Sequence, residues 1–144
     1  MRFTSGGSSL RTFFDTNVLV YTDGQTNPAK LKRALELLNE HKQSASGVLS
    51  LQILQEYFVT VTRKYGVAPA DARRKVELFA ALDVVEPALA DVLAATDLHR
   101  LRRLSYWDAL VIQCAKRSGC QQVLSEDMQH GQVIDGVRIV NPFL

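Results

Sequence analysis

The fold class follows from the stretch Arg11-Thr12-Phe13-Phe14-Asp15-Thr16-Asn17, in which a short apolar segment runs directly into an acidic turn. Residues 11–14 predict a strand, and residues 15–17 are of the types that favour turns. The apolar segment Val18-Leu19-Val20-Tyr21 comes next. In a parallel α/β sheet, the carboxyl ends of the strands lie along one edge, where ligands bind. Asp15 is therefore expected at that edge.

Outward from this stretch, predicted strands and helices alternate along the chain. Proline stands at or near the start of three of the helices, and glycine directly follows the second. Both residues are common at these positions of helices. This alternation favours an α/β fold with a central, mostly parallel, five-stranded sheet and helices on both faces. The predicted strands are residues 11–14, 47–49, 83–85, 122–124 and 137–140, and the predicted helices are residues 27–42, 51–65, 69–82, 87–103 and 105–119.

Length and composition are those of a soluble globular protein. The chain has 144 residues, of which 47% are hydrophobic and 22% charged, and this length suits one domain. Residues 1–10 are rich in Ser and Gly and lack the apolar core of a secretory signal, so we expect a flexible leader followed by a single domain over residues 11–144. No apolar run approaches the roughly 18 residues of a membrane span. A cytoplasmic location without membrane contact is the default expectation.

The two cysteines do not indicate a metal or redox motif. Cys114 and Cys120 form neither a Cys-x-x-Cys pair nor a zinc-binding pattern. Cys114 falls within an apolar helical stretch, where cysteine behaves as a small hydrophobic residue.

Three further acidic residues stand out by position. Asp108 lies at the start of a predicted helix, Asp127 follows the fourth predicted strand, and Glu56 lies within the helix over residues 51–65. Carboxylates gathered with Asp15 at one edge would repel one another unless divalent cations neutralised them. A site for a hard metal ion, and hence phosphate chemistry, is the functional interpretation.

Three of these acids also have a purely local interpretation. Asp15 fits an N-cap or an Asx turn. Asp108 stands three residues after Ser105, as in a capping box, although Glu or Gln is preferred at that position. Asp127 lies in a polar loop, where a solvated side chain is common. Each local interpretation stays open at this point.

Glu56 is the hardest acid to interpret. On a helical wheel it falls opposite the apolar stripe of Leu54, Phe58 and Val61, which favours a surface position. The same helix carries further apolar residues on its other sides, so the face with Glu56 can also meet protein. Ile53, Tyr57 and Val59 are those residues.

The net charge of +2 conceals an excess of basic residues outside the four candidate acids. Without those acids the chain carries 17 basic and 11 acidic residues, a difference of +6. A basic surface around a small acidic centre suits a metal-dependent enzyme that acts on a polyanion, although basic pairs are also common on solvated helix faces. The basic residues cluster at 63–64, 73–75, 100–103 and 116–117.

Taken together, the four acidic segments resemble the four motifs of PIN-domain ribonucleases, and among these the VapC toxins of bacterial toxin–antitoxin pairs. The resemblance runs from about Arg11 to Asn141-Pro142-Phe143, and the leader before Arg11 is its main departure. Each motif is short, but four in order over this length are specific. The segments are Phe-Phe-Asp-Thr-Asn-Val-Leu-Val-Tyr (13–21), Leu-Gln-Glu-Tyr-Phe-Val-Thr-Val-Thr-Arg-Lys (54–64), Leu-Ser-Tyr-Trp-Asp-Ala-Leu-Val (104–111) and Leu-Ser-Glu-Asp-Met-Gln-His-Gly (124–131).

The resemblance implies a PIN-like three-layer α/β/α fold and a metal-dependent endoribonuclease. Asp15 and Asp108 would be the main ligands of one or two Mg²⁺ or Mn²⁺ ions, and Glu56 and Asp127 would complete the site directly or through waters. Thr16, Asn17 and Ser125 would orient these ligands or the substrate. The implied partners are an RNA substrate, a cognate antitoxin protein and a second copy of the chain in a homodimer.

Two other functions are weighed against this one. A phosphatase of the haloacid dehalogenase type also has an aspartate after its first strand, but it needs a second aspartate where this chain has Asn17. No lysine was found that would complete such a site. A PIN-like protein that binds RNA or a partner without cutting is the alternative that remains, although all four acids are present.

Overall fold

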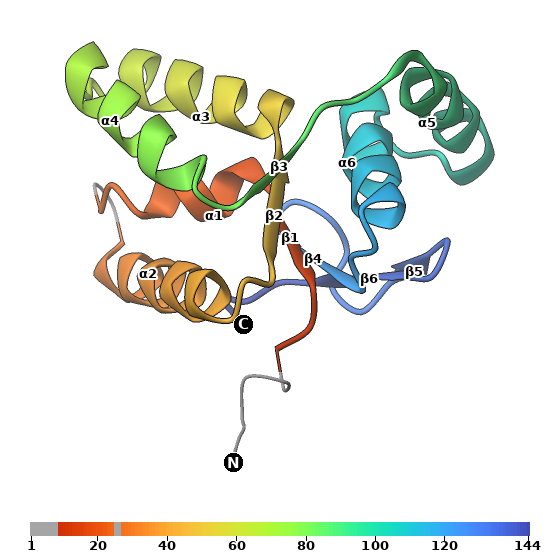
Figure 1. Cartoon of the computed structure of the whole chain (residues 1–144), viewed down its shortest axis with the longest axis horizontal. Coiled ribbons are helices and arrows are strands. Elements are labelled where there is room, and N and C mark those ends of the chain that lie inside the picture. The colour runs from red at the N-terminus through yellow and green to blue at the C-terminus, as the bar shows by residue number, and fades with distance from the viewer. Residues whose placement is uncertain (1–8, 25–26) are drawn as a thin grey trace.

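A computed structural model describes residues 9–24 and 27–144, so most of the expected flexible leader lies outside the described residues. Helices α1 to α4 cover one side of the central sheet, and α5 and α6 cover the other (Figure 1), which confirms the three-layer α/β/α prediction. The elements in chain order are β1 Thr12–Phe14, α1 Thr16–Tyr21, α2 Pro28–Gln43, β2 Gly47–Ser50, α3 Leu51–Arg63, α4 Pro69–Phe79, β3 Asp83–Val85, α5 Leu89–Arg102, α6 Tyr106–Arg117, β4 Gln122–Leu124, β5 Val133–Ile134 and β6 Val137–Val140.

The order of the strands places a topological switch point beside β1. The sheet runs β3-β2-β1-β4-β6-β5, and all neighbouring strands are parallel except β5 and β6. The chain therefore builds outward from β1 through β2 to β3 and then returns to the other side of β1 with β4. Ligands of open α/β sheets bind at such a switch point, outside the carboxyl ends of the strands. Here the switch point lies between the ends of β1 and β4.

The five predicted strands are confirmed, but the described sheet has six strands rather than five. The additional strand β5 pairs antiparallel with β6, with Ile134 opposite Val137. The turn residues Asp135 and Gly136 have φ angles of 49° and 84°. Positive φ at both turn residues is the geometry that favours an Asp-Gly pair in a two-residue hairpin. The short helix α1 was also not predicted, because residues 15–17 indicated only a turn.

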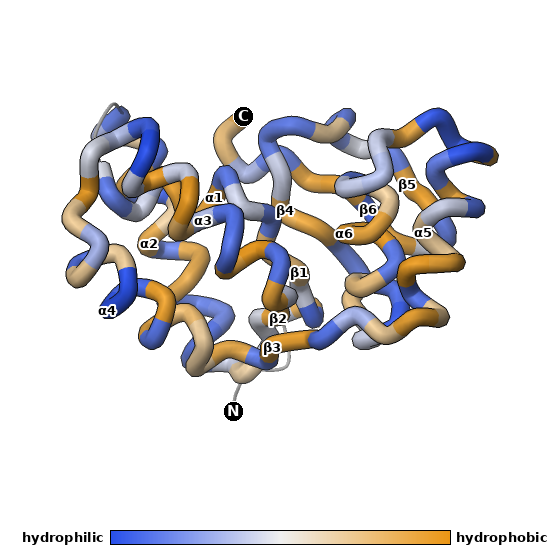
Figure 2. The backbone as a smooth tube through the Cα atoms, turned by 90° about the horizontal axis from the view of Figure 1, so that it is seen from above, coloured by the Kyte–Doolittle hydropathy of each residue, from blue (hydrophilic) through white to orange (hydrophobic). Residues whose placement is uncertain are grey.

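The core lies between the sheet and the helices. Phe13 and Phe14 of β1 and Val48 of β2 are fully buried. Figure 2 shows hydrophobic segments along the central strands and α6. In α4, by contrast, hydrophobic and hydrophilic residues alternate. Six of the twelve residues of α6 are buried, so one face of this helix contributes to the core. Within the described residues, no helix is both long and apolar enough to cross a bilayer.

Candidate active site

Asp15 ends β1 and caps α1. Its Oδ1 accepts the N–H of Thr16 at 2.9 Å, and its Oδ2 accepts the hydroxyl of Ser125 at 2.7 Å. The backbone N–H of Asp15 donates to the carbonyl of Leu124, at the end of the neighbouring strand β4. The N-cap interpretation of Asp15 is therefore confirmed, and the same contacts place this carboxylate at the switch point.

The Asp15 carboxyl group is unusually hard to ionise. Only 7% of the residue is exposed, and its pKa is raised to about 6. Burial is the main cause, and the negative charges of Asp108 and Asp127 add to it. The hydrogen bonds from Ser125 and Thr16 act in the opposite direction. Because like charges raise this pKa, Asp15, Asp108 and Asp127 belong to one electrostatic site.

Asn17 and Ser125 join Asp15 to Asp127. The Asn17 Nδ2 lies 3.1 Å from Asp127 Oδ2 and 3.4 Å from Asp15 Oδ2. The Ser125 hydroxyl, which donates to Asp15, accepts the backbone N–H of Asp127 at 3.1 Å. Asn17 also accepts the backbone N–H of Glu126 through its Oδ1 at 3.1 Å. Asp127 is exposed. These hydrogen bonds nevertheless hold it in place, so it is not a freely solvated loop residue.

Glu56 reaches the site from α3. Its Oε1 accepts the Thr16 hydroxyl at 2.7 Å, and its Oε2 accepts the Gln52 side-chain amide at 3.1 Å. Helices α1 and α3 pack against each other, so the face of α3 opposite its apolar stripe does meet protein. The interpretation of Glu56 as a plain surface residue was therefore wrong. Both of its oxygens are oriented by neutral donors.

Asp108 lies in the first turn of α6 and is partly exposed. Its backbone N–H donates to the Ser105 hydroxyl at 3.0 Å, which is one half of a capping box. The return bond, from the Ser105 N–H to the Asp108 carboxylate, is not found in the described residues. Burial raises the pKa of Asp108, the nearby Ser105 hydroxyl lowers it, and the charges of Asp127 and Glu56 raise it further. Asp108 is thus within the electrostatic reach of Asp127 and Glu56.

The four acids have no basic partner among the described residues. None of them takes part in the ion pairs of residues 9–24 and 27–144. In the same residues, no three acidic, His or Cys side chains are placed as a group that could hold one ion. Asp15 and Asp127 are separated by the groups of Asn17 and Ser125 that bridge them. The acids repel one another, as the charges acting on Asp15 and Asp108 show, and no cation of the described residues offsets this repulsion.

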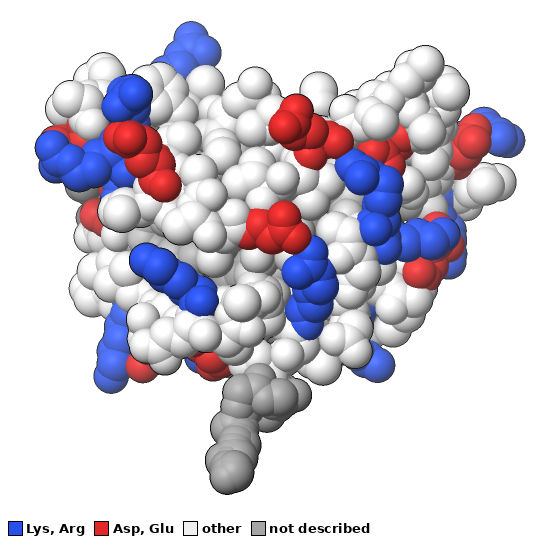
Figure 3. Space-filling model, in the orientation of Figure 1, with Lys and Arg blue, Asp and Glu red and all other residues white. Residues whose placement is uncertain are grey.

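Many of the basic residues noted in the sequence pair with acids instead of forming one patch. On the face shown in Figure 3, Lys and Arg side chains lie beside Asp and Glu side chains. Arg73 pairs with Glu77, and Arg102 and Lys116 both approach Asp135. These are exposed pairs, which contribute little to stability. The residues at 100–103 remain the basic cluster nearest in sequence to Asp108.

A protein-family model, the PIN domain, matches residues 12–134. This chain belongs to the PIN domain family. The matched segment contains Asp15, Glu56, Asp108 and Asp127, which are the acids that surround the switch point. A search of curated protein sequences returns no significant match.

Solved structures share the fold of this PIN domain. A chain of a toxin–antitoxin complex from Klebsiella pneumoniae is 19% identical, with a TM-score of 0.67 over 91% of this chain and 97% of that chain. Mycobacterium tuberculosis VapC20, a toxin that cleaves the sarcin–ricin loop, is 20% identical, with a TM-score of 0.65 over 81% and 89%. A chain of DNA-bound VapBC from Salmonella typhimurium is 19% identical, with a TM-score of 0.64 over 91% and 97%. At these identities the likeness establishes the fold.

The donor set of this PIN domain fits a hard divalent cation. Carboxylate oxygens, an amide and hydroxyls are the ligands and supporting groups that Mg²⁺ prefers, and Mg²⁺ keeps several waters, so one or two direct carboxylates suffice. A cation would also offset the repulsion that raises the pKa values of Asp15 and Asp108. The two cysteines are buried and free, and they play no part in this site.

Sequence reasoning missed several residues around this site. The role of Gln52 beside Glu56 follows from the i, i+4 spacing on α3, which was a usable signal. Glu126, Tyr21 and Lys30 form a second cluster next to Asp127, and no local pattern links them. Their contacts depend on the way that α1 and α2 pack against the loop after β4.

Proposed function

We propose that this protein is a Mg²⁺- or Mn²⁺-dependent endoribonuclease, and that it acts as the toxin of a toxin–antitoxin pair. Asp15 and Asp108 would be the main metal ligands, and Glu56 and Asp127 would complete the site. The observation that carries the proposal is the gathering of these four acids at the β1–β4 switch point, without a basic partner among the described residues. Membership of the PIN family supports the same reaction class.

The chain's own residues would orient the carboxylates and the substrate. A bound cation would lower the pKa of a water molecule and offset charge on the phosphate oxygens. Thr16 and Gln52 fix both oxygens of Glu56, so its charge points in one direction. Ser125 and Asn17 set the spacing between Asp15 and Asp127. Such supporting partners govern both metal affinity and activity.

RNA is proposed to approach over the start of α6. Trp107, the single tryptophan of the chain, is 57% exposed and precedes Asp108. Arg100, Arg102 and Arg103 end α5 just before this turn and are exposed. Basic side chains attract phosphates in a salt-dependent way. The fluorescence of Trp107 therefore gives a direct probe of RNA binding near the carboxylates.

The proposed antitoxin would cover apolar surface on α3 and α4. One hollow is lined mainly by Leu51, Leu54, Phe58, Val59 and Val76, and Leu51 and Val59 are 41% and 48% exposed. Exposed apolar surface of this kind is typical of sites that bind another protein. Two of the similar structures are of toxin–antitoxin and VapBC complexes.

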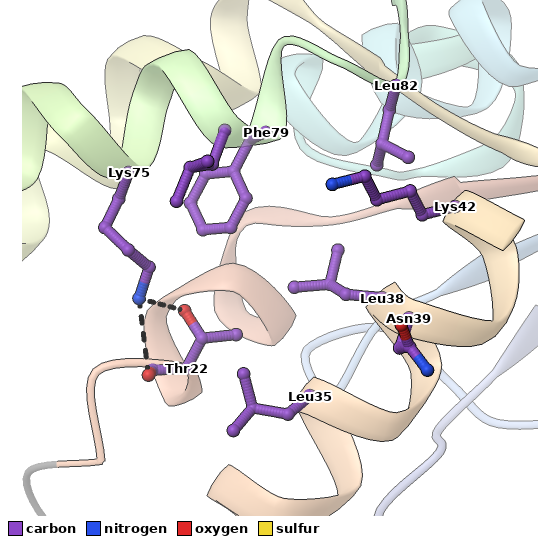
Figure 4. A pocket seen from close by; sticks show the side chains of 9 residues that line it. Thr22, Leu35, Leu38, Asn39, Lys42, Lys75, Phe79 and Leu82 are labelled. Atoms are coloured by element: carbon purple, nitrogen blue, oxygen red, sulfur yellow. Dashed lines mark hydrogen bonds between the residues drawn. The ribbon is translucent and has the colours of Figure 1, made fainter.

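A second apolar hollow, of about 250 Å³, lies on the other side of α4, between that helix and α2 (Figure 4). Leu35, Leu38 and Leu82 point into it, and Lys75 donates from α4 to the carbonyl and the hydroxyl of Thr22. The two hollows border the same helix, so an apolar antitoxin segment could cross α4 and contact both. The proposal includes a homodimer as the active form and a cytoplasmic location.

Cleavage of structured RNA tests the reaction. We expect purified protein to cut RNA in Mg²⁺, Asp15→Asn to abolish cutting, and Asp97→Asn, which alters an exposed acid of α5, to leave it unchanged. Tight RNA binding without cutting by the folded wild type would instead favour the binding-only alternative.

Expression in bacteria tests the toxin role. The wild-type chain should arrest growth, Asp15→Asn should not, and co-expression of the small gene next to this one should restore growth. Normal growth with soluble, folded wild-type protein and no co-purifying partner would favour a free-standing PIN nuclease. Light scattering of the pure protein would establish whether it is a dimer.

A further inference from the structure

A cluster of three polar side chains lies on the outer side of the loop that carries Asp127. Lys30, in the first turn of α2, forms an ion pair with Glu126 of this loop. Tyr21, at the end of α1, donates its hydroxyl to Glu126 Oε1 at 2.5 Å and accepts from Lys30 Nζ at 3.1 Å. The Glu126 carboxylate thus accepts from two donors, one on α1 and one on α2.

Aromatic contacts enclose this cluster. The Lys30 Nζ lies 4.8 Å from the ring centroid of Tyr21 and 5.6 Å from that of Phe143. The Tyr21 and Phe143 rings pack edge to face at 5.0 Å. The side chains of Lys30 and Glu126 are 29% and 25% exposed. An ion pair so enclosed is more rigid than a pair on the open surface, and breaking it leaves a partly buried charge.

Glu126 is held on two sides, and the two anchors are one helical turn apart on α1. Its backbone N–H donates to the side chain of Asn17, and its carboxylate binds Tyr21. The same Asn17 side chain donates to Asp127. The preceding residue, Ser125, donates to Asp15. A shift of Glu126 would therefore move Asp127 relative to Asp15.

We infer that Lys30, Tyr21 and Glu126 form a positioning cluster that fixes Asp127 in the carboxylate site and thereby strengthens the binding of a divalent cation. This inference rests on the proposed function. Glu126 acts through Asp127, since its own carboxylate is occupied by Lys30 and Tyr21. A cluster that only fastened α2 to the sheet would contribute to stability and leave ion binding unchanged.

Mn²⁺ binding, measured from the free-ion signal in electron paramagnetic resonance, tests the inference without any need for cleavage. Lys30→Met and Glu126→Gln should weaken Mn²⁺ binding by about tenfold or more, as the removal of supporting partners does at other metal sites. Tyr21→Phe, which removes one hydroxyl, should weaken it less, and Lys30→Arg should retain it. Asp83→Asn is the matched control, because it breaks the Arg11–Asp83 ion pair at the opposite edge of the sheet.

A double variant separates positioning from direct ligation. In the Asp127→Asn background, the further change Glu126→Gln should have no added effect on Mn²⁺ binding, because its effect passes through Asp127. An equal further weakening would show that Glu126 acts on ion binding independently of Asp127 and would overturn the inference. Folded Lys30→Met, Glu126→Gln and Tyr21→Phe proteins that bind Mn²⁺ like the wild type would overturn it as well.

The wild type and Asp15→Asn distinguish a failure of this inference from a failure of the proposed function. If the wild type shows no Mn²⁺ binding that depends on Asp15, the metal site itself is wrong and the inference is wrong with it. If binding depends on Asp15 but not on the cluster, only the positioning role is wrong.

Discussion

Asp15 combines two roles in one side chain. As the N-cap of α1 it accepts a backbone N–H, and as a buried acid it lies in the field of Asp108 and Asp127. The first role favours the charged form and the second opposes it. The raised pKa shows that burial and repulsion outweigh the hydrogen bonds.

The pH dependence of stability follows from this shift. The pKa of Asp15 is about 6 in the folded protein and about 3.9 in an unfolded chain, so the folded state binds this proton more tightly. Its contribution to stability is complete below about pH 4 and is lost as the pH rises through about 6, at a cost of roughly 3 kcal/mol. Without metal, Asp15→Asn should therefore unfold at the same or a higher temperature than the wild type at pH 8.

The difference between Asp15→Asn and the wild type should shrink at pH 5, where Asp15 is largely protonated. Added Mg²⁺ should raise the unfolding temperature of the wild type but not that of Asp15→Asn. Asp97→Asn, at an exposed site, should show no such pattern. A lower unfolding temperature of Asp15→Asn at pH 8 would mean that capping outweighs repulsion.

Thr16 gives a second prediction at this scale. Removal of its hydroxyl in Thr16→Val frees Glu56 Oε1, so the cleavage rate should fall about tenfold, whereas Thr16→Ser should keep most of the rate. Thr96→Val is a suitable control, because the Thr96 hydroxyl bonds only to a carbonyl of its own helix in the described structure. Equal activity of Thr16→Val and the wild type would contradict a role for this hydrogen bond.

At the scale of elements, α5 and α6 form a pair that carries Asp108. Asp91 of α5 is 1% exposed, and it accepts from Gln113 and Arg117 of α6. Burial raises the pKa of Asp91, but the N–H of Ala88 and these two side chains outweigh burial and hold the pKa below its usual range. Asp91 thus links α5 to α6, the helix that carries Asp108, although the Arg117 side chain is itself 44% exposed.

Asp91→Ala should destabilise the protein by roughly 2 kcal/mol or more, because it removes the buried charged acceptor shared by the Ala88 N–H, Gln113 and Arg117. The stabilisation from Asp91 is present above the usual aspartate pKa of about 3.9 and is lost as the pH falls through the lower folded value. Chemical denaturation at pH 7 would measure the destabilisation. Asp71→Ala, which removes an exposed ion pair on α4, should lower the free energy of unfolding by less than about 1 kcal/mol. Similar losses for Asp91→Ala and Asp71→Ala would contradict a structural role for Asp91.

The end of α5 supplies the prediction on substrate binding. Replacement of Arg100, Arg102 and Arg103 by Ala should weaken RNA binding and make it less sensitive to salt. The slope of the logarithm of affinity against the logarithm of salt concentration should fall by about 0.7 for each phosphate of a single strand that these arginines neutralise. Mn²⁺ binding should not change. Arg73→Ala with Arg74→Ala, on α4, is the control. Unchanged affinity and slope in the triple variant would show that this cluster is only a solvated helix end.

Most elements could be predicted from the sequence, and the exceptions have physical reasons. Helix α1 has six residues, which is too short for a helical period to show. Strand β5 has two residues, although the Asp135-Gly136 pair was a usable hairpin signal. Glu56 was the hardest acid to place, because its partner Thr16 is 40 residues away. The roles of the four acids in metal binding stay predictions.

At the scale of the whole molecule, the site exists only when distant segments meet. Asp15 and Asp127 follow neighbouring parallel strands, and α3 and α6 bring Glu56 and Asp108 from the two sides of the sheet. The position of Asp15 at the carboxyl edge of a parallel sheet could be expected from the alternation of strands and helices. The contacts of Asn17 and Glu126 could not, because they depend on packing between α1 and the loop after β4.

The proposed nuclease would cut RNA with a divalent cation held by Asp15, Asp108, Glu56 and Asp127. The most direct test is the rate of RNA cleavage by EDTA-treated protein during a titration with Mg²⁺, for the wild type, Asp15→Asn and Asp97→Asn. We predict no cleavage in chelator, restoration by Mg²⁺ for the wild type and Asp97→Asn, and none for Asp15→Asn at any Mg²⁺ concentration. Full activity of the wild type in excess chelator, or Mg²⁺-restored activity of Asp15→Asn, would contradict the account.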